Sequence, residues 1–240
     1  TYWCCVNCPG NPGAWKRHAV YHKEVKGFRK RTEDGGVTQE RQRELAEEEA
    51  RRAAQSGDAY DKLLAEGGRY ASQQDYRRSA RTFREAIALR PDRPGAYYSL
   101  GAALSNSGHR AEAAQRYLEA KERYPAGLEG WAVSTARAFS MLIREVCAEV
   151  AKPEWWNDTE LKALSARVVR AAPDDMNAHD MRALVLSGQC GNAWEVGPRS
   201  AAELMEAATQ YERAAALCSI PLAKAQFTGN AAWCRSQLQR

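Results

Sequence analysis

The sequence predicts an all-α fold built from stacked helix–turn–helix units, and three observations indicate it. A set of residues recurs at an interval of about 34 residues, a length typical of helical-hairpin repeats. From Thr38 onward the helix-favouring residues Ala, Leu, Glu and Arg dominate. The alternating apolar and polar residues of β-strands are nearly absent. Because one helical hairpin cannot bury its apolar face alone, the pattern predicts several hairpins packed in a row.

Six positions carry the repeat, and each has a packing role. A glycine on the first helix lets the second helix approach, and an apolar residue fills the space between the helices. Small residues lie where the helices cross, an aromatic residue plugs the gap to the next unit, and a proline stops the second helix. The first copy contains Gly67, Tyr70, Ser79, Phe83, Ala86 and Pro91, and the second contains Gly101, Leu104, Ala113, Tyr117, Ala120 and Pro125.

This pattern resembles the tetratricopeptide (TPR) repeat family, which implies a right-handed superhelical stack of helix–turn–helix repeats. The resemblance covers residues 57–240, and it is specific in the first two units and looser afterwards. A third unit begins after Pro125, with Trp131 at the place of Tyr97. Further helices are expected at 132–150, 161–175, 176–189, 203–218 and, as a cap on the stack, 222–239.

Two segments rich in Pro, Gly and Asn are predicted to be loops between these helices, "PEWWND" and residues 187–200. Asn157 with Glu160, and Ser200 with Glu203, have the spacing of a capping box at the start of a helix. The second loop is long for a repeat turn. It is interpreted either as a neutral surface insertion or as a binding edge of the stack.

The segment 1–24 differs in kind because it gathers cysteine and histidine. Cys5, Cys8, His18 and His22 would suit one tetrahedral, structural Zn²⁺, with Cys4 as the alternative to Cys5. A site closed by four protein ligands leaves no position for an activated water, so no catalytic role is assigned to it.

The same segment resembles the end of a MYND-type zinc finger, in which a helix carries Trp-x2-His-x3-Cys. Here Trp15 and His18 match, and His22 stands in place of the last cysteine. The family binds two zinc ions through further cysteines that this sequence lacks. The alternative interpretation is therefore a degenerate, metal-free remnant.

Residues 25–56 are interpreted as a basic linker followed by a charged helix. Lys23 to Arg31 is a basic run, and Glu47 with Arg51 has the favourable i, i+4 order on a helix. The basic run is either a solvated linker or a contact for nucleic acid or an acidic protein.

Composition limits the other possibilities. A net charge of +5 is too small to indicate nucleic acid by itself. Cys147, Cys218 and Cys234 lie in apolar helical surroundings and are expected to be buried thiols, which favours an intracellular reducing compartment. The cytoplasm is expected, or an organelle if a targeting segment once preceded Thr1. No apolar run approaches the length of a membrane span. Because common catalytic motifs are absent, we expect a non-enzymatic protein.

The TPR resemblance implies an interaction scaffold or adaptor, in which the first helices line a concave groove for a peptide or helix. A structural subunit of a large assembly, with Trp155 and Trp156 exposed, is a further hypothesis, and a nucleic-acid-associated protein is the alternative. The places at which chaperone-binding relatives clamp a carboxylate hold Leu64, Gly68, Ser99, Glu129 and Val133, which do not suit that role. The groove is predicted to contain Asp61, Leu64, Tyr98, Ala102, Ser105, Glu129 and Phe139.

Overall fold

The computed structural model describes residues 57–191 and 193–239, together with Glu44, Glu47, Glu48 and Arg51, which are helical. Helices are the only regular secondary structure in these residues, which confirms the all-α prediction. None of the described helices is long and apolar enough to cross a membrane. The chain divides at Tyr124 into two compact units, which are described one at a time.

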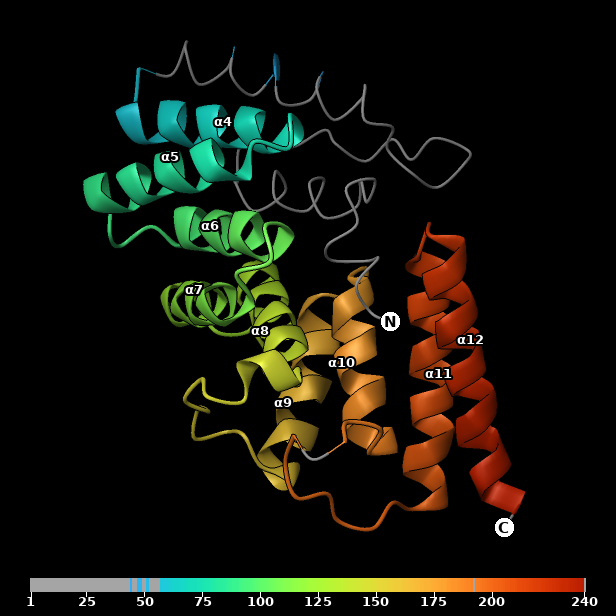
Figure 1. Ribbon diagram of the computed structural model, residues 1–240. Helices are drawn as coiled ribbons and strands as arrows, with labels where there is room; N and C mark the ends of the chain where they lie inside the picture. Colours follow the sequence, from blue (N-terminus) through green and yellow to red (C-terminus); the bar gives the residue numbers. More distant parts are fainter. Residues whose placement is uncertain (1–43, 45–46, 49–50, 52–56, 192, 240) are drawn as a thin grey trace. The chain divides into compact units, whose positions relative to one another are not determined.

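The first unit contains two helical hairpins in chain order (Figure 1). Its helices are α4 (Ala59–Ser72), α5 (Tyr76–Leu89), α6 (Pro94–Asn106) and α7 (Arg110–Arg123). Each first helix packs on its second helix, and α5 also packs on α6, so that the hairpins are stacked. This confirms the two hairpins predicted from the repeat.

A glycine on the first helix of each hairpin receives an aromatic ring from the second helix. A Cβ atom added to Gly67 would lie 2.5 Å from the Phe83 ring, and one added to Gly101 would lie 2.9 Å from the Tyr117 ring. Both rings are fully buried, as predicted. They were expected to plug the gap to the next unit, and the structure shows that each ring lies against the glycine of its own hairpin.

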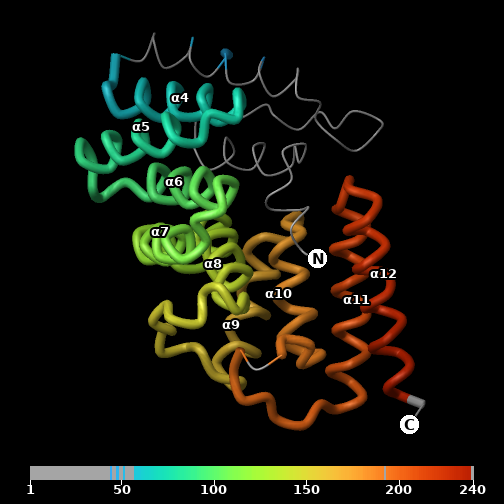
Figure 2. Tube along the Cα trace, in the orientation of Figure 1, coloured from blue at the N-terminus to red at the C-terminus, as the bar shows by residue number. Residues whose placement is uncertain are grey.

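The second unit continues the series of packed helices. Its helices are α8 (Glu129–Leu142), α9 (Asp158–Ala171), α10 (Met176–Ser187), α11 (Ala201–Leu217) and α12 (Pro221–Ser236), with short 3₁₀ turns η1 (Glu145–Cys147) and η2 (Gln237–Gln239). Here α8 packs on α9 and α10, α10 packs on α9 and α11, and α12 packs along α11 (Figure 2). These elements match the predicted order of first and second helices.

The helix expected over 132–150 is shorter than predicted, because α8 ends at Leu142. The Lys152 ammonium group donates hydrogen bonds to the backbone carbonyls of Leu142, at 3.1 Å, and Cys147, at 2.8 Å. Carbonyls at a helix end lack partners within the helix, so a lysine that folds back satisfies them and favours termination there.

The predicted helix starts are confirmed in detail. The Asn157 side chain accepts a hydrogen bond from the Glu160 backbone N–H and caps α9. Ser200 and Glu203 form a complete capping box at the start of α11. Cys147, Cys218 and Cys234 are buried, as expected for structural thiols.

Replacing Phe83, whose ring lies against Gly67, should lower the stability of the first unit. Phe83→Ala removes a fully buried ring and leaves a cavity, so the free energy of unfolding should fall by about 3–5 kcal/mol. Urea denaturation followed by circular dichroism measures the change, and Arg81→Ala on the exposed side of α5 serves as control. A loss below about 1 kcal/mol for Phe83→Ala would contradict this packing.

Candidate functional site

Five predicted partner-binding residues lie on the first helices of the first unit. On α4, Asp61 is partly exposed and Leu64 is buried. On α6, Tyr98, Ala102 and Ser105 are all buried. Asp61 is therefore the one member of this group whose side chain reaches solvent without a rearrangement.

Tyr98 is held by packing within the second hairpin. Its ring lies against the Tyr117 ring with centroids 5.4 Å apart, and only 2% of its surface is exposed. Tyr98 was predicted to line an open groove, which its burial contradicts. Its burial means that truncating it would leave a cavity and cost stability, so loss of binding in such a variant would not identify a contact residue.

A second tyrosine joins the two hairpins of this unit. The backbone N–H of Ala96, in the first turn of α6, donates a hydrogen bond to the Tyr60 hydroxyl oxygen at 3.1 Å. Burial raises the pKa of Tyr60 to about 12, so the phenol stays neutral. Because the first N–H groups of a helix have no partner within the helix, Tyr60 fixes where α6 begins relative to α4.

The remaining two predicted contact residues lie on α8. Glu129 is exposed in the first turn. Phe139 is buried, and its ring lies 5.5 Å from Trp156 and 5.8 Å from Trp194 between centroids. Trp156 also packs beside Trp155. Trp155 and Trp156 were expected to be exposed, but the structure half-buries both because they close this aromatic cluster.

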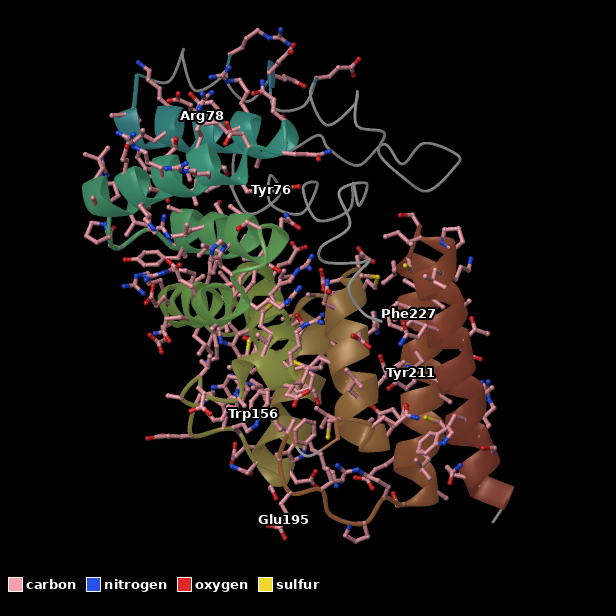
Figure 3. The ribbon with its side chains drawn as sticks, viewed as in Figure 1. Tyr76, Arg78, Trp156, Glu195, Tyr211 and Phe227 are labelled. Carbon is pink, nitrogen blue, oxygen red and sulfur yellow. The ribbon has the colours of Figure 1, made fainter. Side chains whose placement is uncertain are left out.

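The insertion after α10 is fastened to the start of α9. The Arg199 guanidinium donates two hydrogen bonds to the Asp158 carboxylate, at 2.8 and 2.5 Å. These bonds, with one from the Trp194 indole N–H, hold the pKa of Asp158 well below its usual range. Trp156, which is labelled in Figure 3, donates a hydrogen bond from its indole N–H to the Ala193 carbonyl oxygen at 2.7 Å. The described part of the insertion is therefore structural where it meets α9.

One candidate contact residue was missed because the predicted groove positions were not extended to α10. Counted back from Ala183, which takes the glycine place, Asp180 occupies the position of Tyr98 on α6 and Leu64 on α4. Asp180 is 8% exposed, and its Oδ1 has no hydrogen-bond partner. Its burial raises the pKa to about 7 against the opposing effect of Arg144.

A buried carboxyl oxygen without a hydrogen-bond partner is costly, and buried carboxyl groups with a shifted pKa gather at functional sites. Asp180 is therefore the strongest polar candidate in the second unit. His179, beside it, has both ring nitrogens engaged: Nδ1 lies 2.6 Å from Gln210 Oε1, and Nε2 lies 2.8 Å from the Pro173 carbonyl oxygen. The His179 side chain is buried.

The predicted zinc ligands Cys5, Cys8, His18 and His22, like the rest of segment 1–24, lie outside the described residues. Within the part of the chain that the structure describes, no group of three or more His, Cys, Asp or Glu side chains could hold a metal ion. Zinc binding stays a prediction.

Comparison with known families supports the repeat architecture. Residues 67–108 match the family model described as TPR repeat. The match begins at Gly67 and includes the first glycine–aromatic pair, α6 and Gly101. No curated protein matches the sequence.

Breaking the Asp158–Arg199 pair should destabilise the second unit. Arg199→Ala removes two charge-assisted hydrogen bonds from Asp158, which keeps the Lys162 ammonium group at 3.2 Å and the Trp194 indole N–H, so it should cost about 1.5–3 kcal/mol of unfolding free energy. The matched control is Arg81→Ala, which breaks an exposed pair with Glu85 and should cost about 0–1 kcal/mol. Chemical denaturation measures both, and equal costs would refute a structural role for the pair.

Asp180 should make stability depend on pH. Its pKa is raised to about 7 from 3.8, so between these values the folded state holds a proton that the unfolded state releases. Asp180 therefore lowers stability as pH rises from about 4 to about 7, by up to roughly a few kcal/mol. Asp180→Asn should be more stable than wild type at pH 7.5 and should lose this slope in urea denaturation. A variant that keeps the wild-type slope would show that Asp180 is ionised in the fold.

Proposed function

We propose that the chain is a non-enzymatic scaffold or adaptor, or a subunit of a larger assembly, that binds other proteins through its TPR-like repeats. The match of residues 67–108 to the TPR repeat, within a series of stacked helical hairpins, is the observation that carries this proposal. Stacked hairpins present the surfaces of their first helices side by side, and such surfaces bind extended peptides and amphipathic helices.

Carboxylates are the groups on these first helices that suit a partner best. Asp61 on α4 is partly exposed and Glu129 on α8 is exposed. Asp180 on α10 adds a buried carboxyl group whose Oδ1 has no hydrogen-bond partner. On the first unit, a partner segment with Lys or Arg side chains would be attracted to Asp61. On the second unit, such a segment would be attracted to Glu129 and would offer a hydrogen-bond donor to the Oδ1 atom of Asp180. The proposal assigns no catalytic residue.

The alternative is association with nucleic acid through the basic run from Lys23 to Arg31, which lies outside the described residues. The dependence of binding affinity on salt concentration distinguishes the two functions. Binding to phosphates weakens steeply as salt rises, whereas a partly apolar protein contact tolerates it. The predicted structural zinc is a separate proposal, and elemental analysis should return about one zinc ion per chain if it is right.

Charge reversal on the first helices tests the proposed function. Asp61→Lys combined with Glu129→Lys places like charges against a basic partner, so affinity should fall at least about tenfold. Affinity purification from the source cells with quantitative mass spectrometry identifies partners of the wild type, and titration against the recovered partner measures the loss. The control is Glu122→Lys, an exposed change on the second helix α7.

Two results would contradict the proposal. An unchanged partner set for the double variant would remove the first helices from the interface. Capture of nucleic acid that is released as salt is raised, and lost when the basic run is neutralised, would favour the alternative function.

A further inference from the structure

The exposed side of α5 in the first unit concentrates positive charge. Residues 69–93 contain seven arginines, no lysine and three acidic residues, an excess of four positive charges, while the whole chain has a net charge of +5. Between Tyr76 and Ala86 every exposed residue of α5 is charged. These residues, the arginine face, are Arg77, Arg78, Arg81, Arg84 and Glu85.

The repeat itself does not require these arginines. Phe83 on α5 and Tyr117 on α7 hold the same place in their hairpins, 34 residues apart, and both rings are buried. The four arginines have no such counterparts on α7. At the matching places stand Ala111, Glu112, Gln115 and Leu118. Packing of the hairpins therefore explains the buried side of α5 and leaves its arginine face unexplained.

Three of the arginines lie in one row and are available to a ligand. Arg77, Arg81 and Arg84 are spaced by four and three residues, so they project from the same side of the helix. Arg77 makes no ion pair among the described residues. Arg81 pairs with Glu85 at 3.1 Å, and Arg84 pairs with Glu112 at 2.8 Å. Because exposed ion pairs of this kind are weak, a stronger anion can replace them.

An aromatic ring lies beside this row. Tyr70, in the last turn of α4, is partly exposed, and its ring centroid lies 5.0 Å from the Arg69 guanidinium and 5.8 Å from that of Arg78, which is labelled in Figure 3. The Arg78 side chain is 70% exposed, so it can move aside. A guanidinium held over an exposed ring is bound more weakly than a stacked base. In the second hairpin the place of Tyr70 is taken by Leu104.

The turn between α4 and α5 keeps a side chain where glycine is favoured. Gln74 has φ 64° and is the one non-glycine residue with a positive φ in the described part of the chain, whereas Gly108 takes the matching place in the second hairpin with φ 90°. A left-handed residue after a helix is usually glycine, because a Cβ atom there costs stability. The exposed Gln74 amide can both donate and accept hydrogen bonds.

The composition of this surface selects its ligand. A protein partner needs apolar surface at the centre of its interface, and the arginine face has none. Guanidinium groups bind phosphates through paired hydrogen bonds, and an aromatic ring among basic residues stacks on an unpaired base. An amide such as that of Gln74 suits a base edge or the ribose 2′-hydroxyl group, which DNA lacks. Together these groups fit single-stranded RNA.

We propose that the arginine face and the turn before it bind single-stranded RNA, with Arg77, Arg81 and Arg84 on phosphates and Tyr70 stacked on a base. This function goes beyond the protein binding proposed above and does not depend on it. The surface is separate from the carboxylates of the first helices. It is also separate from the basic run Lys23 to Arg31, in which no aromatic platform was identified.

Removing charge from the row tests the phosphate contacts. Fluorescence anisotropy measures binding of the full chain to a labelled RNA of ten uridines at several salt concentrations. Arg77→Gln combined with Arg81→Gln should lower the affinity at least tenfold. It should also make the plot of log affinity against log salt less steep by about 1.4, the value for two phosphate contacts on a single strand. Arg170→Gln with Arg213→Gln, two exposed changes in the second unit, is the control of equal charge and should bind as the wild type does.

Two further variants separate binding from stability. Tyr70→Leu introduces the residue that the second hairpin has at this place, so circular dichroism should show an intact fold, while affinity for the uridine strand should fall at least about fivefold through the loss of stacking. Gln74→Gly relieves the left-handed residue, so the melting temperature should rise although binding weakens. A residue with a purely structural role would not show this opposite change.

Three outcomes would overturn the proposal. Equal binding of the uridine strand to the wild type and to the Arg77 and Arg81 double variant would place any RNA site elsewhere, such as the basic run. A peptide of ten glutamates that binds as tightly as the RNA would identify an acidic protein segment as the ligand. A strand of ten deoxythymidines that binds as tightly as the uridine strand would overturn the assignment to RNA.

Discussion

The close approach of an aromatic ring to a glycine is the contact on which the repeat architecture depends. The Phe83 and Tyr117 rings lie where a Cβ atom on Gly67 or Gly101 would be, so each second helix packs closer to its first helix than any other residue would allow. The ring at the same time fills the volume between the helices, and a fully buried aromatic side chain makes one of the largest single contributions to a core. A glycine that weakens a helix locally thus stabilises the hairpin as a whole.

Because this contact depends on residues at fixed intervals, much of the fold could be predicted from the sequence. The helices of the first unit, and the start of α9 at Asn157, follow from periodicity and capping alone. The end of α8 could not be predicted in this way. It depends on Lys152, which reaches back to carbonyls at Leu142 and Cys147 through a loop without periodic pattern. Local sequence patterns predict where helices begin. The end of a helix that runs into an irregular loop depends instead on contacts made by residues further along the chain.

The candidate site was less predictable, because burial depends on neighbours that no spacing reveals. Tyr98 has the register of a groove residue, yet it is packed against Tyr117. Two aspartates show that the surroundings of a carboxyl group, and not the residue type, determine the direction of its pKa shift. Asp158 meets Arg199 and has a lowered pKa, so it stabilises the fold at neutral pH and loses that effect as pH falls below its ordinary range. Asp180 is buried, and its desolvation outweighs the opposing effect of Arg144 and raises its pKa. Its position could have been found by counting back from Ala183, but its protonation could not.

The helix α12 also carries a glycine at the repeat position that Gly67 and Gly101 occupy. In a stack of repeats each helix is stabilised by the neighbours that pack on its apolar faces. Around Gly229, α12 combines exposed apolar residues with a space of the kind that an aromatic ring fills at Gly67 and Gly101. Local helix stability alone would favour alanine there. Gly229 thus keeps the register position of the repeat, although no ring of the described residues lies against it.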